Sequence, residues 1–382
     1  MDTGMEAIIE VLPENWREKA RELKAFRRAG DYLKTPEDLL RLLLLWADLG
    51  TFGHTAAFLR TAGDFPMSKV AIFQRVQKSA EWLEWLTVNF SRKHEYLAEC
   101  PEWLEEYRVT VADATKVMGK QLYTLHMMIK LFSLSVAEQI LTDGATGESM
   151  TNFQSVRKND LMLADRAYGT VRSMRCLYYV FRLKAKAFHL YRLKEKGRYV
   201  RFDLTEELKD WKEGKTLCFS VFYRQGKDYF PIRVCARGKS AEDIEKGTAR
   251  VKASNSGKKR GKVSELQSIY NKFIVLVTNL PEEITAGQIL ELYRMRWQIE
   301  LVFKRLKSIL DYDKLQTKTD LTSRAWLHCK LLTAAICELY VQRGVFSPYG
   351  YDAGGHLPSL IMAGIRSCLR RVDVSAFSDL ST

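Results

Sequence analysis

The residue patterns that identify several common enzyme classes are missing from this chain of 382 residues. Its seven cysteines include no CxxC pair and its six histidines are isolated, which argues against a zinc site and against a disulfide framework. The serines form no G-x-S-x-G nucleophile elbow. Gly214-Lys215-Thr216 resembles part of a phosphate-binding loop, but Lys209 stands where a Walker motif requires glycine. Zinc enzymes, serine hydrolases and P-loop proteins are therefore not indicated.

Long apolar runs are also scarce. The longest, LLRLLLLWA, is too short to span a bilayer and contains Arg41. The first residues, MDTGMEAIIE, carry acids where a secretory signal peptide needs a basic start. We therefore expect a protein without a membrane partner, located in the cytoplasm of a bacterium or archaeon and associated with the nucleoid.

Positive charge is what the chain has in excess. It contains 60 Lys and Arg against 46 Asp and Glu, a formal net charge of +14, and its 46% hydrophobic content is that of a folded protein. Such a balance favours an anionic partner, most simply nucleic acid, although a merely basic globular protein is the alternative.

The cations concentrate in two runs. Residues 182–201 contain eight cations against one acid, with Tyr191 and Tyr199 interleaved, and residues 246–262 contain seven cations and no acid. The second run includes Lys258, Lys259 and Arg260 and lacks apolar residues around them, so a solvated loop is expected there. Together the runs favour a surface for a phosphate backbone.

The hydrophobic periodicity predicts an α/β fold of several parts. Residues 1–105 read as helices, and two short helices around 63–66 resemble a helix-turn-helix, with a helical bundle that has one polar side as the alternative. From 106 to 183 we expect a strand ending near Asp113, two more strands in a meander, a helical piece at about 147–157, a strand ending at Asp165 and a fifth strand. That order is typical of a ribonuclease-H-like core.

The rest of the chain divides into three parts. Residues 184–282 predict a basic, strand-rich insert, with a hairpin turn at Gln225-Gly226-Lys227-Asp228. Residues 283–312 return to helical periodicity and rejoin the core. Residues 313–382 predict a C-terminal helical region, a candidate for dimerisation.

The returning segment, residues 283–310, is predicted to be one amphipathic helix that begins after the N-cap Thr285. At about 100° per residue, its polar side chains gather within roughly 80° of one another. They are Tyr293, Arg296, Glu300, Lys304 and Lys307. Ion pairs between residues i and i+4 on a solvated helix explain the charged residues of this stripe. They do not explain why Tyr293 lies on the same face.

Three acids suit metal-assisted phosphodiester chemistry. Asp113 and Asp165 are expected at the carboxyl ends of strands, where side chains converge at one edge of a sheet, and Glu300 follows on the helix. Two Mg²⁺ ions, with Mn²⁺ as the alternative, need only such hard oxygen ligands. Arg296 can hold a phosphate with two donors, and Lys304 and Lys307 are point charges for the same purpose.

Four residues of the stripe match Y-(2)-R-(3)-E-(6)-K: Tyr293, Arg296, Glu300 and Lys307. Together with VADAT around Asp113 and LADRAYG around Asp165, they resemble the DDE transposases of the insertion-sequence-four family. The resemblance covers residues 105–312. It implies a ribonuclease-H-like catalytic core, with Asp113, Asp165 and Glu300 as metal-binding catalytic acids.

The resemblance also implies the activity and the partners. Cut-and-paste transposition would involve a homodimer bound to terminal inverted repeats and to target double-stranded DNA, with hairpin ends as intermediates. The second motif adds Arg166 and Tyr168 to the expected DNA contacts. The family is expected to hold a flipped base with a tryptophan of the insert; Trp211 is the insert's one tryptophan, and Tyr270 and Phe273 lie where the family residue is expected. A catalytically silent DNA-binding relative and a structure-selective nuclease of the same fold are the alternatives.

Overall fold

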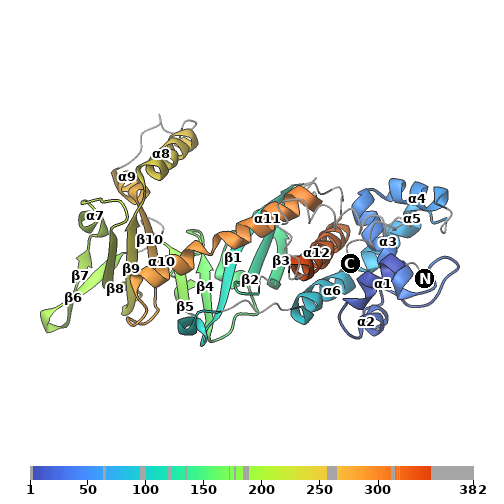
Figure 1. The fold of residues 1–382 in the computed structure, drawn as a ribbon, viewed down its shortest axis with the longest axis horizontal. Helices are drawn as coiled ribbons and strands as arrows, with labels where there is room; N and C mark the ends of the chain where they lie inside the picture. The colour runs from blue at the N-terminus through green and yellow to red at the C-terminus, as the bar shows by residue number, and fades with distance from the viewer. Residues whose placement is uncertain are drawn as a thin grey trace.

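The computed structural model describes residues 3–62, 66–94, 100–118, 122–133, 136–171, 173–175, 178–183, 189–255, 265–310, 315, 317 and 319–345. The molecule is elongated (Figure 1). Helices from the N-terminal third form one end, a mixed sheet with a long helical segment across it forms the middle, and the strands and helices of the predicted insert form the other end.

The N-terminal region is helical, as its periodicity predicts. Its helices are α1 (Thr3–Glu10), α2 (Trp16–Glu22), α3 (Pro36–Leu49), α4 (Phe52–Thr61), α5 (Lys69–Lys78) and α6 (Ala80–Lys93). Thr35 caps α3 by accepting from the Asp38 amide, Pro36 takes the first turn, and Gly50 ends the helix with a φ of 80°. Within the described ranges no single helix is long and apolar enough to cross a membrane, and α3 and α4 pass that test only as a pair bent by 119°.

Five strands form the central part of the sheet. They are β1 (Arg108–Met118), β2 (Leu122–Lys130), β3 (Val136–Asp143), β4 (Asp160–Ala164) and β5 (Tyr178–Arg182). The spatial order is β3-β2-β1-β4-β5, in which β1, β2 and β3 pair antiparallel and β1, β4 and β5 pair parallel. A meander followed by two parallel crossovers is therefore present.

Two expectations for this region are wrong. β1 does not end near Asp113 but continues to Met118. Its pairing with β2 runs on to Met118, which lies opposite Leu122 of β2. The helix expected at 147–157 is reduced to the short 3₁₀ turn Met150–Asn152. On either side of that turn the backbone bonds to side chains: the Gly147 carbonyl accepts from Asn152 Nδ2 at 3.0 Å, and the Gln154 amide donates to Glu138 at 2.9 Å.

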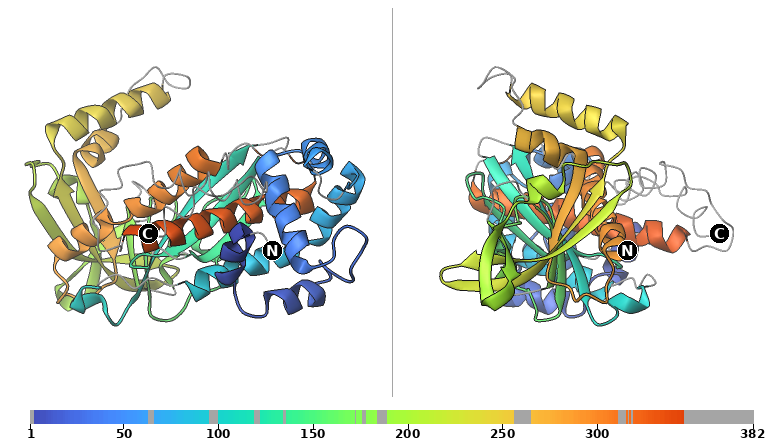
Figure 2. Two further views of the ribbon diagram at one scale, coloured as in Figure 1. Left: turned by 45° about the vertical axis from the view of Figure 1, so that its right-hand side comes forward. Right: turned by 90° about the vertical axis from the view of Figure 1, so that its left-hand side faces the viewer.

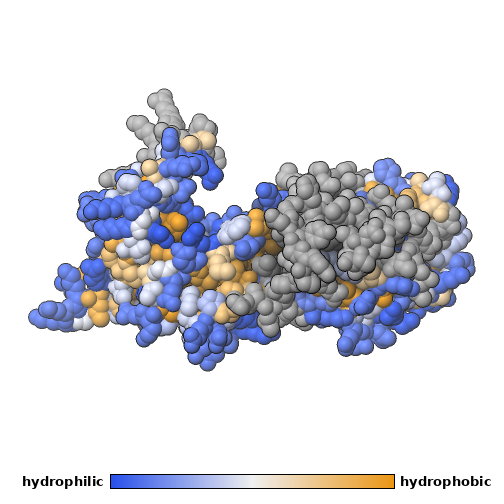
Figure 3. Space-filling view, viewed as in Figure 1, coloured by the Kyte–Doolittle hydropathy of each residue, from blue (hydrophilic) through white to orange (hydrophobic). Residues whose placement is uncertain are grey.

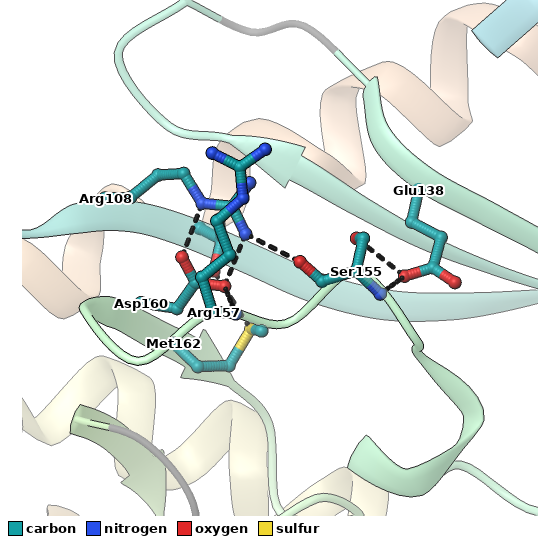
Figure 4. Close-up of polar contacts among 7 residues, drawn as sticks. Arg108, Glu138, Ser155, Arg157, Asp160 and Met162 are labelled. Carbon is teal, nitrogen blue, oxygen red and sulfur yellow. Dashed lines mark hydrogen bonds and ion pairs between the residues drawn. The ribbon is translucent and has the colours of Figure 1, made fainter.

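A buried ion pair fixes the register between β1 and β4. Arg108 opens β1 opposite Asp160, which opens β4 and is fully buried. The Arg108 guanidinium donates to both carboxylate oxygens of Asp160 and also to the Ser155 carbonyl at 3.0 Å. Glu138 of β3 in turn accepts from the Ser155 amide at 2.8 Å and hydroxyl at 2.7 Å (Figure 4). The β3–β4 connection is thereby tied to both strands.

The insert continues the same sheet. Its strands are β6 (Leu190–Lys194), β7 (Arg198–Phe202), β8 (Thr216–Gln225), β9 (Asp228–Gly238) and β10 (Phe273–Thr278), and β10 pairs antiparallel with β5. The predicted hairpin turn closes with Gln225 opposite Asp228, and Gly226 takes a φ of 62°. The sequence did not predict the helices α7 (Leu204–Glu207), α8 (Ala241–Asn255) and α9 (Glu265–Lys272). α8 and α9 project from the insert (Figure 2), and most of the coloured surface of this projection is hydrophilic on the face shown in Figure 3.

Apolar side chains pack on both faces of the sheet. Val111 and Leu163 join a first core that extends into the N-terminal helices, whereas the next residues, Ala112 and Ala164, join a second core under the insert. This alternation follows from the period of two in a strand. The C-terminal region predicted to be helical contains α12 (Asp320–Val345), which packs against α6, α3 and α5. Gln139 of β3 contacts His328 of α12 at 3.1 Å.

We predict that Asp160→Asn lowers the free energy of unfolding by about 3–5 kcal/mol, because it leaves the Arg108 cation half-buried without its carboxylate. Asp228→Asn, the same change at an exposed position in the hairpin, should change it by less than about 0.5 kcal/mol. Urea unfolding followed by circular dichroism measures both. Equal small effects would show that the ion pair does not hold the register.

Candidate active site where β1 and β4 meet α10 and α11

The two aspartates occupy adjacent places on parallel strands. Ala112 of β1 pairs with Ala164 of β4, so the next residues along the two strands are Asp113 and Asp165. By the alternation of the strands, both lie on the face of Val111 and Leu163, which α11 covers. Asp165 follows the end of β4, as the sequence predicts, with a side chain 40% exposed.

The segment expected as one helix is two helices, α10 (Ala286–Arg294) and α11 (Trp297–Leu310). Thr285 caps α10 in a capping box with Gln288, as predicted. The break lies at Met295 and Arg296, where the amides bond to carbonyls three residues back rather than four. Periodicity did not reveal it because no proline or glycine marks the position, and Ile289 and Ile299 on either side are buried in the same core.

The broken segment contacts both aspartates. The Tyr293 hydroxyl donates to Asp165 Oδ1 at 3.4 Å. Arg296, 14% exposed, lies between two acids: its Nη1 is 3.7 Å from Asp113 Oδ2, and its Nη2 donates to Glu300. Arg296 also stacks over the Tyr293 ring at 5.7 Å. The three acids proposed from the sequence are thus joined through one arginine and one tyrosine.

Burial and crowding of like charges set the electrostatics of the site. The pKa of Asp113 is raised to about 6, chiefly by burial and to a lesser extent by the carboxylates of Glu148 and Glu300. The Ala114 amide and Arg296 oppose this rise. Burial and Asp165 raise the pKa of Tyr293, so its phenol stays protonated and donates. A cation placed among these acids would favour their charged forms.

The donor set suits a hard divalent cation. Asp113, Asp165 and Glu300 offer only carboxylate oxygens, the ligands that such a cation prefers. In the described part of the chain, no three His, Cys, Asp or Glu side chains converge into a ready-made metal cluster. Arg296 instead pairs with Asp113 and Glu300.

A group of cations lies beside Asp165. Arg182, at the end of β5, is 3.8 Å from Asp165 Oδ1. The pKa of Lys239 is lowered to about 8, chiefly by burial and also by the positive charges of Arg182 and Arg166. Arg166 was predicted from its motif; Arg182 was identified only as part of a basic run. Lys239 belongs to no motif in the sequence. It follows β9, and its position is determined by the pairing of β9 with β10.

The other predicted DNA contacts have different surroundings. Lys304 is exposed on α11 and Lys307 is half-buried. Tyr168 is fully buried in the second core, which corrects its expected role, because a side chain without exposed surface offers no contact to DNA. Lys258, Lys259 and Arg260 lie outside the described residues. Phe273 is 1% exposed, so its ring presents no open face for a base, and Trp211 is half-buried.

A family model described as a transposase DDE domain matches residues 93–336, and the chain belongs to that family of transposases. The resemblance predicted from the motif is thereby confirmed. The transposase for insertion sequence element IS421 of Escherichia coli is 26% identical over 355 residues, which cover 88% of this chain and 93% of the relative. The transposase for IS231F of Bacillus thuringiensis subsp. israelensis is 26% identical over 201 residues, 48% of this chain and 42% of the relative.

Among solved structures, the chain is similar to a piggyBac transposase synaptic complex with hairpin DNA. The match covers 100% of this chain and 84% of the piggyBac chain, with a TM-score of 0.46 and 9% sequence identity.

We predict that Arg296→Ala lowers the rate of DNA-end cleavage by about 10- to 100-fold, the effect of losing charge-assisted hydrogen bonds worth ~1.5–3 kcal/mol. Arg294→Ala is the matched control, because Arg294 is 70% exposed two residues away and pairs with Glu291. Single-turnover cleavage of labelled DNA carrying the element's ends measures both. A loss of the same size in both variants would contradict the assignment.

Proposed function

We propose that this protein is a cut-and-paste transposase that cleaves the ends of its element and joins them to target DNA, with Asp113, Asp165 and Glu300 as the catalytic acids. The observation that carries this proposal is the meeting of the three acids through Tyr293 and Arg296. Membership in the DDE transposase family supports the reaction class.

The strand order β3-β2-β1-β4-β5 supports a ribonuclease-H-like core, because its antiparallel meander is followed by two parallel strands. We divide the chain as the sequence predicts: helices to 105, a core from 106 to 183 that 283–312 completes, the insert from 184 to 282, and a C-terminal region from 313. The continuous sheet makes the insert an extension of the core rather than a separate body.

Asp113, Asp165 and Glu300 would hold two divalent cations, Mg²⁺ or Mn²⁺. When bound, such ions relieve charge on the phosphate and make water a better nucleophile. The residues of the chain supply the positioning. Tyr293 remains a hydrogen-bond donor, and Arg296 has donors that suit a phosphate as well as a carboxylate.

DNA would lie across the face that carries α10 and α11. Lys304 and Lys307 lie further along α11, and Arg166, Arg182 and Lys239 lie beside Asp165. We propose that these cations bind the backbone of the terminal inverted repeats, that two copies of the chain act together on two ends, and that the ends pass through hairpins. Binding through so many phosphates predicts a strong dependence on salt.

We predict that Glu300→Gln lowers the cleavage rate of terminal-repeat DNA in Mg²⁺ by at least about 1,000-fold, or ~4 kcal/mol of transition-state stabilisation, while gel-shift affinity changes little. Glu291→Gln is the control, since Glu291 is 55% exposed and its partners are Arg237 and Arg294.

The same assay distinguishes the alternatives. A silent DNA-binding relative would bind the repeats without cutting them in any variant. A structure-selective nuclease would cut with no preference for the repeats over a scrambled sequence. Cleavage by Glu300→Gln at the parent rate would show that the site is assigned wrongly.

A further inference from the structure

Two cysteines that belong to none of the motifs face one another in the insert. Cys218 of β8 lies directly opposite Cys235 of β9 in the antiparallel ladder, and their sulfur atoms are 3.7 Å apart. Cys235 is fully buried in the first core, whereas Cys218 is exposed. The pair therefore combines a thiol that a reagent in solution can reach with a second thiol in contact with it.

The register of the hairpin makes this position suitable for a disulfide. Gln225 and Asp228 close a two-residue turn, and the closing pair of such a turn is hydrogen-bonded through the backbone. Hydrogen-bonded and non-hydrogen-bonded pairs alternate from there, so Cys218 and Cys235, seven pairs along, are a non-hydrogen-bonded pair. Pro231, which has no amide to donate, occupies a pair of the same kind. Cα atoms in such pairs are about 4.5 Å apart, within the range of roughly 4.4–6.8 Å that disulfides span.

A fixed cation lies against the exposed thiol. Arg233, 8% exposed, is on the same face of β9 as Cys235, and its Nη2 donates to Cys218 Sγ at 3.6 Å. The same guanidinium is held by the Pro281 and Ile284 carbonyls, which accept from Nη1 at 2.6 and 2.8 Å. A positive charge held in this way stabilises a thiolate at Cys218.

The proton between the two sulfurs belongs to Cys235. The hydrogen bond that joins them lowers the pKa of Cys218 and, together with burial, raises the pKa of Cys235. Arg233 also lowers the pKa of Cys218, against burial and the Glu282 carboxylate, which raise it. Glu282 is itself bound to Ser220, whose hydroxyl donates to it at 2.8 Å. Cys218 is therefore the more reactive sulfur of the pair.

The simpler alternative is that both cysteines only fill the core, because a free cysteine packs as a small apolar side chain. That explanation suits Cys235, which is buried in the first core. It does not suit Cys218, because this exposed side chain fills no core and its sulfur accepts from an arginine.

We propose that Cys218 and Cys235 form an oxidation site, at which a hydroperoxide converts the two thiols into a reversible cross-strand disulfide. Cys218 is the attacking sulfur, and Cys235 is the sulfur that completes the disulfide. The inference does not rest on the proposed function, because the site uses none of the residues assigned to DNA cleavage.

The reaction has two steps. In the first, the Cys218 thiolate attacks one oxygen of hydrogen peroxide: a sulfur–oxygen bond forms, the oxygen–oxygen bond breaks, and the leaving hydroxide takes a proton from solvent. In the second, the Cys235 sulfur attacks the resulting sulfenic acid: the disulfide bond forms, the sulfur–oxygen bond breaks, and hydroxide leaves with the Cys235 proton as water. The two thiols thus lose two electrons and two protons, and one peroxide becomes two molecules of water.

The test is hydrogen peroxide treatment of the full-length chain, followed by peptide mapping without reduction. Trypsin places the two cysteines in different peptides, residues 216–224 and 234–237, so the disulfide joins two peptides that are otherwise separate. The parent should give the joined pair, lighter by two hydrogens than the two thiol peptides, and dithiothreitol should separate it. Two separate peptides after peroxide, or sulfinic acid at Cys218 in place of the joined pair, would overturn the proposal.

Two variants distinguish the roles of the two sulfurs. In Cys235→Ala the sulfenic acid at Cys218 should persist and react with dimedone, at least about tenfold more than in the parent, where Cys235 consumes it. Cys218→Ser should give no dimedone label at Cys235, because that thiol is buried. Thermal unfolding of the reduced variants checks that each is folded. Equal dimedone labelling of the parent and Cys235→Ala would show that Cys235 does not complete a disulfide.

Alkylation measures the reactivity of Cys218 in the unaltered chain. Iodoacetamide at pH 7 should react with Cys218 at least about tenfold faster than with Cys100, because burial and Glu105 raise the pKa of the half-buried Cys100 thiol. Cys100 thereby serves as a control within the same molecule. Reaction of both thiols at the same rate would contradict the role of Cys218 as the attacking sulfur.

Discussion

The register between β1 and β4 is the constraint on which the candidate site depends. Residues five positions beyond the Arg108–Asp160 pair are Asp113 and Asp165, so the ion pair at one end of the ladder determines which side chains meet at the other. A slip by one residue would turn one aspartate to the opposite face. Because Asp160 is fully buried, its carboxylate needs the Arg108 guanidinium as well as the Arg157 amide, and a shifted register would move Arg108 away from it.

The second requirement is to bring Glu300 to this place from 135 residues further along the chain. The insert leaves the core after β5 and returns through β10, which pairs with β5 itself. α10 therefore begins beside the core, and apolar side chains hold α10 and α11 against the sheet. The break at Met295 and Arg296 lets Tyr293 contact Asp165 while Arg296 and Glu300 contact one another beside Asp113.

Sequence patterns predicted those parts of the fold that local chemistry determines. Thr285 was recognised as a helix boundary because a cap acts within one turn. The described strands of the core were recognised from their apolar patterns, and the insert was recognised as rich in strands. The extension of β1 to Met118 and the burial of Tyr168 were not, since each depends on a partner distant in sequence. The helix break was missed because its cause is tertiary contact rather than a breaking residue.

The candidate site shows the same division. Tyr293, Arg296 and Glu300 could be predicted because helical spacing places them on one face, and the motif connects them to Asp113 and Asp165. Arg182 and Lys239 could not, because the pairing of β10 with β5 and β9 brings them there. The charges that surround the acids are therefore a property of the fold rather than of any local pattern.

The central claim is that Asp113 binds a catalytic metal ion together with Asp165 and Glu300. The most direct measurement is the rate of terminal-repeat cleavage by Asp113→Cys in Mg²⁺ and in Mn²⁺, because Mn²⁺ accepts a sulfur ligand more readily than Mg²⁺ does. We predict no detectable cleavage in Mg²⁺ and recovery of at least about tenfold in Mn²⁺ relative to Asp113→Ala. Cleavage in Mg²⁺ at the parent rate, or equal inactivity of the two variants in Mn²⁺, would contradict the account.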